Sequence, residues 1–186
     1  VEVQNEVVGI AQLGDGGANA ITFSSATNGA VLGISNTGGA AASAISITGN
    51  SFTKFVHTVA GTSAHTYITN SIACASLDIS NNTFTNLVTN SNGVMNGILN
   101  TPSSATNKIF NANNFSNITG GTGQVTVMSL GGGTTGSNVT GNTINSITGG
   151  GGVTGISITN LAATSTVSGN TVSGMNSTGV GAPSII

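Results

Sequence analysis

Apolar and polar positions recur along this chain with a period near thirty residues. In five places a seven-residue unit reads apolar, small polar, Gly/Asn/Ala, Asn, small polar, apolar, small polar. Successive central Asn residues are 32, 31, 29 and 28 positions apart. Such self-similarity at a fixed period is typical of repeat proteins whose units stack on one another. The central residues are Asn50, Asn82, Asn113, Asn142 and Asn170.

Other apolar positions keep step with this unit. A second motif, Val-x-Gly-Ile, lies between the Asn units in 31–34 and 153–156, with one extra residue in 94–98 and more loosely in 125–130. A degraded sixth copy opens the chain, since Asn19 precedes Asn50 by 31 residues. A further apolar residue follows each central Asn by five positions: Phe55, Leu87, Ile118, Ile147 and Met175.

The period and the residue types together predict one fold. Helix formers are scarce and no Leu ladder is present, which argues against helical and leucine-rich repeats. Short alternating strands with tight turns fit a β-helix coil. We therefore predict an all-β chain: a single parallel β-helix, or β-solenoid, of about six coils with 28–32 residues each and no capping helix. Residues 1–186 form one domain, in which 1–18 is an incomplete first coil or docking strand and 19–186 holds the repeats.

Stacking turns each apolar position into an interior column along the axis. The central Asn is expected at a bend with left-handed backbone angles, where stacked amides hydrogen-bond one another. The glycine before it, as in Gly49, suits such a bend. Glycine-rich stretches at 119–123, 131–136 and 148–152 are predicted to bulge as loops from the corners. One predicted column contains Phe52, Phe84, Phe115, Ile144 and Val172.

The unit Ile79-Ser80-Asn81-Asn82-Thr83-Phe84 resembles the right-handed parallel β-helix repeats of pectate-lyase-like proteins. It is still more similar to the Ser/Thr/Asn/Gly-rich repeats of secreted bacterial surface proteins and adhesins. The resemblance covers the chain from about Asn19 onward. It implies a fold and says little about activity, because many functions share this scaffold.

Charge is almost absent from the sequence. Charged residues make up 3% of the chain, Arg and Trp are missing, and the net charge is −2. No basic surface for nucleic acid is expected, and no apolar run approaches the roughly 20 residues of a membrane span. Cys74 stands alone among small or apolar neighbours and is expected to be buried. No cofactor or metal is predicted.

The few reactive side chains do not form a catalytic pattern, so we expect no enzyme. Asp78 lies between two apolar residues and should point outward, without the partner carboxylate that a polysaccharide hydrolase needs. For His57 and His65, exposed loop positions are favoured over a weak metal site. Lys54 and Lys108 are expected at the solvated surface. Near the start, a charged edge is favoured over a calcium site for Glu2, Glu6 and Asp15.

Two polar columns flank the apolar residue that follows each Asn. If they face outward, they form parallel ladders on one flat face, similar to the Thr-x-Thr arrays of ice-binding β-solenoids. A face of this kind could also bind glycan, and an ordinary hydrated β-surface is the plainer interpretation. The ten residues are Ser51, Thr53, Thr83, Thr85, Asn114, Ser116, Thr143, Asn145, Thr171 and Ser173.

The ends of the chain suggest assembly. Uncapped β-stacks expose strand edges that template further pairing, and gatekeeper charges are scarce here. We predict a secreted, extracellular or cell-surface structural protein: a filament subunit stacking head to tail on copies of itself, or a stalk segment of a surface adhesin. A glycan- or ice-binding module is the alternative, and a polysaccharide lyase or hydrolase comes third. The expected stacking residues are Val7, Val8, Ile10, Val180, Ile185 and Ile186.

Overall fold

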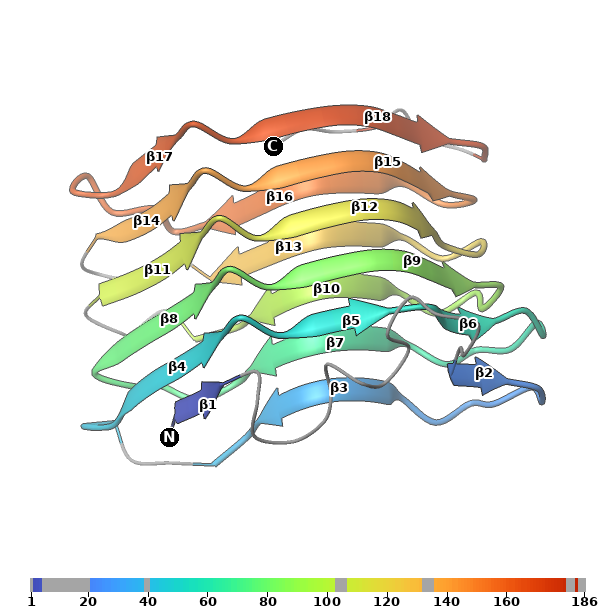
Figure 1. Ribbon diagram of the computed structural model, residues 1–186, viewed down its shortest axis with the longest axis horizontal. Helices are drawn as coiled ribbons and strands as arrows, with labels where there is room; N and C mark the ends of the chain where they lie inside the picture. Colours follow the sequence, from blue (N-terminus) through green and yellow to red (C-terminus); the bar gives the residue numbers. More distant parts are fainter. Residues whose placement is uncertain are drawn as a thin grey trace.

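The chain winds through three parallel β-sheets and visits each sheet once per coil (Figure 1). The structure is a computed structural model that describes residues 2–4, 21–38, 41–102, 107–131, 136–179 and 183. Within these residues the strands form five coils and two strands of a further coil, and no helix occurs. The predicted all-β solenoid, with about six coils, is confirmed.

The strands of each sheet are stacked in sequence order, so neighbours in space are one coil apart in the chain. Sheet A contains β1 (Glu2–Gln4), β4 (Ala44–Thr48), β8 (Ser76–Ser80), β11 (Asn107–Asn111), β14 (Ser137–Thr140) and β17 (Thr166–Ser168). Sheet B contains β2 (Ile21–Phe23), β5 (Ser51–Thr53), β6 (Phe55–His57), β9 (Thr83–Thr89), β12 (Asn114–Thr119), β15 (Thr143–Gly149) and β18 (Thr171–Ser177). Sheet C contains β3 (Val31–Asn36), β7 (His65–Asn70), β10 (Met95–Asn100), β13 (Val125–Gly131) and β16 (Val153–Thr159).

The predicted apolar column exists and is continuous. Phe52 pairs with Phe84, Phe84 with Phe115, Phe115 with Ile144, and Ile144 with Val172. The first four side chains are fully buried, and Val172 is partly buried at the end of the stack. The three phenyl rings stack face to face, with centroids 5.1 and 4.4 Å apart and planes inclined by 6° in each pair. Aromatic stacking therefore adds to apolar burial in the lower coils.

The central Asn residues form a hydrogen-bonded ladder inside the core. In the first rung the backbone N and the Nδ2 of Asn50 donate to Oδ1 of Asn82 at 2.9 and 3.0 Å. The same pair of bonds links Asn82 to Asn113, Asn113 to Asn142, and Asn142 to Asn170. Each amide above the first also donates to a carbonyl of the coil below. The ladder satisfies polar groups that would otherwise be buried without partners.

The left-handed residue at this corner is the one before the central Asn. The sequence-based placement of the bend on the Asn itself was wrong, because the Asn side chain must point inward to join the ladder. The preceding residue turns the chain and faces away from the core. These residues have φ between 53° and 69°, and they are Gly49, Asn81, Ala112, Gly141 and Gly169.

A second left-handed column divides the strands of sheet B. It lies four residues after each central Asn, with φ between 54° and 60°. Side chains alternate along a strand, so residues three apart would normally face opposite sides. A bend between them lets both Phe84 and Leu87 point inward. The column contains Lys54, Asn86, Asn117, Ser146 and Gly174.

The turns from sheet B to sheet C are tight and stacked. The expectation of bulging loops was wrong for 119–123 and 148–152, since the backbone of one turn packs directly on the next. Gly150 N donates to Gly121 O at 2.7 Å. A Cβ added to Gly121 would overlap Ser91 O, which explains why glycine recurs here. Of the third predicted loop, 132–135 lies outside the described residues.

Removing one rung of the ladder should destabilise the fold strongly. Asn113→Ala leaves the Ile79 carbonyl and the Asn82 backbone N–H without the partners they have now. Each buried group left unpaired costs about 1–3 kcal/mol, so we expect a loss of at least about 3 kcal/mol in unfolding free energy. The control Asn114→Ala removes a neighbouring exposed amide and should change it by less than about 0.5 kcal/mol. Urea denaturation of both variants measures the difference, and equal effects would contradict the ladder.

A methyl group in the stacked turns should be tolerated only where space exists. Gly121→Ala places a Cβ against the backbone of the turn below, whereas a Cβ at Gly152 has nothing within 4 Å. Because backbone must shift in the first case, we expect Gly121→Ala to cost about 1–3 kcal/mol and Gly152→Ala to be close to neutral. Thermal and urea unfolding would compare the two. A Gly152→Ala variant that is the less stable one would argue against tight turn stacking.

Candidate functional site

The predicted polar face lies on sheet B and forms two columns in register. Ser51 pairs with Thr83 and Thr53 with Thr85, and the pairing continues to Thr171 and Ser173 at the end of the stack. Hydroxyls bridge neighbours within and between coils: Ser116 Oγ donates to Thr85 Oγ1 at 3.0 Å. Exposure varies along the face. Thr53 is buried, whereas Asn114, Thr143, Asn145, Thr171 and Ser173 are exposed.

Comparable outward columns occur on the other two sheets, which sequence reasoning did not single out. On sheet A, Asn111 pairs with Thr140 and Ser80, and Thr140 Oγ1 donates to Asn111 Oδ1 at 3.0 Å. On sheet C, Thr126 pairs with Asn96 and Thr154. Aligning the repeats with one another would have revealed these columns on sheets A and C, because positions two residues apart in a strand share a face. Sheet B is thus one of three similar polar surfaces.

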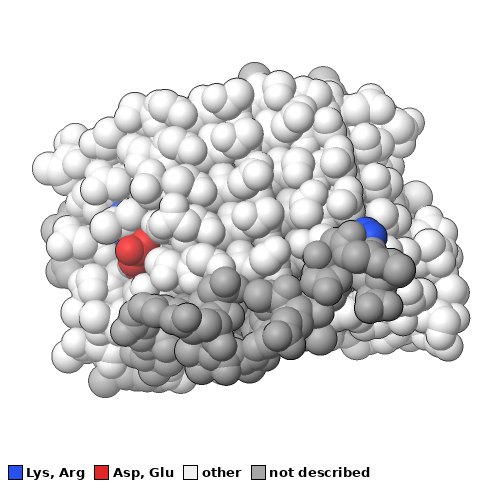
Figure 2. Space-filling model, in the orientation of Figure 1, with Lys and Arg blue, Asp and Glu red and all other residues white. Residues whose placement is uncertain are grey.

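Charge is nearly absent from the face of the molecule in Figure 2, where almost all described atoms belong to neutral residues. Asp78 lies between the buried Leu77 and Ile79 and is half-buried on the outer side of sheet A, as expected. Its carboxylate accepts a hydrogen bond from Ser80 Oγ. Two of the three residues considered for a calcium site, Glu6 and Asp15, lie outside the described residues. All six residues predicted to stack at the two ends lie outside them as well.

The two histidines are not exposed loop residues, and that expectation was wrong. His57 ends β6 and His65 begins β7, and both side chains are at most 1% exposed. His57 Nδ1 lies 3.0 Å from His65 Nε2, and His57 Nε2 lies 3.2 Å from the Ser25 carbonyl. Burial and the neighbouring His57 lower the pKa of His65 to about 4. No group of three or more His, Cys, Asp or Glu residues suited to a metal ion occurs in the described part of the chain.

Lys108 is buried, so its predicted solvated position was wrong. It occupies the inward column of sheet A between Leu77 and Ser137, and its side chain is 1% exposed. Its Nζ donates to Pro102 O at 2.8 Å and to Gly131 O at 3.0 Å. Burial lowers the pKa of the ammonium, while the nearby Cys74 acts in the opposite direction.

The ammonium lies where a second Asn ladder ends. Asn36 Nδ2 donates to Asn70 Oδ1, and Asn70 Nδ2 donates to Asn100 Oδ1. In the next coil this position is Leu130, so Asn100 Nδ2 turns to the Gly131 carbonyl that Lys108 also contacts. The charged side chain therefore completes a polar corner whose amide ladder has stopped.

Cys74 is buried, as predicted, and burial raises the pKa of its thiol. No disulfide is formed in the described structure. The thiol is therefore an interior packing group.

A search of the described residues for a helix long and apolar enough to span a membrane finds none.

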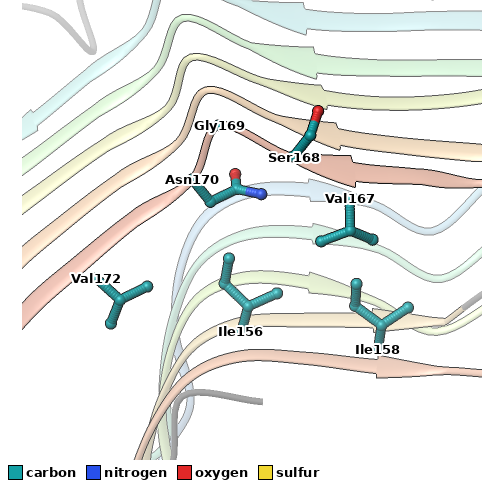
Figure 3. Close-up of a pocket in the computed structure, with 7 residues that line it drawn as sticks. All are labelled: Ile156, Ile158, Val167, Ser168, Gly169, Asn170 and Val172. Carbon is teal, nitrogen blue, oxygen red and sulfur yellow. The ribbon is translucent and has the colours of Figure 1, made fainter.

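At the C-terminal end of the stack lies a notch, where no strand of sheet C within the described residues is level with β17 and β18. It forms a cavity of about 250 Å³. Figure 3 shows Ile156, Ile158 and Val167 facing one space, whereas Ser168 points away. Val167 is 41% exposed here, although its equivalent Val139 one coil below is fully buried. The notch thus exposes interior positions of the repeat.

Fold and ladders define the chain as a parallel β-solenoid repeat protein. Comparison with known protein families, with curated proteins and with solved structures finds no match. The fold class therefore rests on the register of the strands and the interior ladders of this chain alone.

The burial of Lys108 should protect its amine from chemical labelling. We expect acetylation of Lys108 in the native protein to be at least about tenfold slower than acetylation of the half-buried Lys54, because reagent must wait for local opening. Mass spectrometry of partially labelled protein measures both rates. In strong denaturant the two lysines should react alike. Faster labelling of Lys108 in the native state would contradict its burial.

Proposed function

We propose that this chain is a structural β-solenoid of the extracellular space, either a filament subunit that stacks head to tail or a stalk segment of a surface adhesin. The observation that carries the proposal is the continuity of the stack. Three in-register sheets, an Asn ladder and stacked apolar columns run through the coils. A rod held in this way resists bending and proteolysis, since the inner strands of each described sheet are paired along both edges.

The end of the stack supports assembly. The last strands, β17 and β18, present unpaired edges in the described structure, and Val167 exposes an interior position. In a parallel solenoid one end complements the opposite end, so contacts between copies propagate in one direction. A filament or a longer array of coils would cover this apolar surface. The Ser-, Thr- and Asn-rich exterior resembles that of secreted surface proteins, which supports an extracellular location.

The alternative is a glycan- or ice-binding module that uses the polar columns of sheet B. The in-register exposed side chains from Asn114 to Ser173 favour it. The similar columns on sheets A and C argue for an ordinary hydrated surface. Binding on a glycan array or ice shaping would promote this alternative. A polysaccharide lyase or hydrolase ranks third, and turnover of a polysaccharide would promote it.

Electron microscopy of the purified chain over a range of concentrations tests the filament form. We expect linear fibres about one coil wide. Val167→Lys should abolish them, because it places a charge on the apolar end, whereas the exposed, outward Thr166→Lys in the same strand should leave them intact. Fibres that persist in Val167→Lys would show that copies of the chain contact each other through a surface other than the one around Val167. Monomers at every concentration would reject head-to-tail stacking.

A further inference from the structure

The histidine pair joins the first described coil to the rest of the stack. His57 is in β6 and His65 is in β7, the strands on which β2 and β3 pack. The Phe23 ring of β2 lies against both imidazoles, with centroids 5.6 and 6.0 Å away. His57 Nε2 lies 3.2 Å from the carbonyl of Ser25, just after β2. The pair therefore contacts coil 21–38 through both apolar packing and a hydrogen bond.

The hydrogen bonds assign one protonation pattern to the neutral pair. A carbonyl only accepts, so His57 Nε2 must carry the hydrogen that bonds to Ser25 O. His57 Nδ1 is then an acceptor, and His65 Nε2 donates to it across 3.0 Å. This leaves His65 Nδ1 as a bare lone pair, and it is buried without a hydrogen-bond partner. A further proton has no acceptor to bond with at that atom.

Among the residues that the structure describes, none places a compensating negative charge beside the pair. Ser63 Oγ and Thr89 Oγ1 lie 3.4 and 3.3 Å from His65 Nε2, and neither is ionised in the acid range. Besides the histidines, Tyr67 is the one titratable side chain in β2, β3, β5, β6, β7, β9 and β10, and burial raises its pKa further. Lys54, between β5 and β6, is the nearest charged residue along the chain and is cationic. Protonation would thus bury an unpaired positive charge.

We propose that the His57–His65 pair makes docking of coil 21–38 pH-dependent: the coil packs on the neutral pair and is released when the pair gains a proton. β2 and β3 are the last described strands at their ends of sheets B and C, and within the described residues each pairs with one strand only. In a solenoid each coil contacts only its neighbours, and an end coil can detach while the others remain folded. Release opens the rings to water, where a charged imidazole is solvated. This inference does not depend on the proposed extracellular role.

The direction follows from the pKa of His65. Its value of about 4 in the docked state lies below the ordinary 6.5, so docking disfavours protonation. Docking is then fully favourable above pH 6.5 and weakens as the pH falls from 6.5 toward 4. A single histidine with a pKa of about 4 in the docked state and 6.5 in the released state increases the population of the released state about 30-fold when the pH falls from 7.5 to 5.

Hydrogen–deuterium exchange of the full chain tests the proposal. After correction for intrinsic exchange, opening of 21–38 should increase about 30-fold from pH 7.5 to pH 5, while 107–131, which contains no histidine, should change little. His65→Gln keeps a neutral amide beside His57 and should remove the pH dependence. Tyr67→Phe, in the same buried strand, removes a hydroxyl without a partner and should retain it.

Titration of the wild-type histidines, followed by nuclear magnetic resonance, tests the proposal without the His65→Gln variant, which matters if that variant does not fold. His65 should titrate well below the ordinary value, together with the signals of coil 21–38. Ordinary titration near pH 6.5 with unchanged signals from this coil would overturn the proposal. So would wild-type exchange of 21–38 that is independent of pH, or His65→Gln that opens with falling pH as the wild type does.

Discussion

The structure depends on one constraint: each residue stacks directly on its equivalent in the neighbouring coils. Parallel in-register pairing places residues about 30 positions apart within contact distance, at a spacing of about 4.8 Å. A side chain's main neighbours are therefore copies of its own position. Asn82 shows the consequence, since its amide is satisfied by Asn50 on one side and Asn113 on the other. A polar group can then occupy the core because its partner is supplied by the repeat itself.

This constraint explains why the sequence was informative about the fold. Stacking demands similar residues in each column, so the Phe52 and Phe55 columns and the Asn ladder appear as a period in the sequence. The tight glycine turns were less evident. Glycine in a turn fits both a flexible loop and close backbone contact, and only the position of Ser91 O under Gly121 separates the two. The second left-handed column could not be found, because Lys54, Ser146 and Gly174 share no chemical type.

The errors at His57, His65 and Lys108 have a common origin. Each was expected to be exposed because its residue type usually is, although aligning the repeats places Lys108 and His65 at positions that are apolar in other coils. Lys108 follows Leu77 by 31 residues, and His65 lies in register with Val31 and Met95, so their columns are interior ones. In a solenoid the position of a residue in the repeat decides its burial more than its residue type does, because turning one side chain outward would shift the register of the side chains that follow it.

The same constraint limits how far an exceptional residue can act. Lys108 ends the apolar part of its column, yet Leu77 in the coil below remains buried, and two backbone carbonyls at the corner accept hydrogen bonds from its ammonium. The histidine pair lies in β6 and β7 of one coil, far along the axis from β15 and β18. Because coils contact only neighbours, a charge that forms there weakens the adjacent coil without opening the distant ones. A solenoid can thus combine a stiff body with an end that responds to its surroundings.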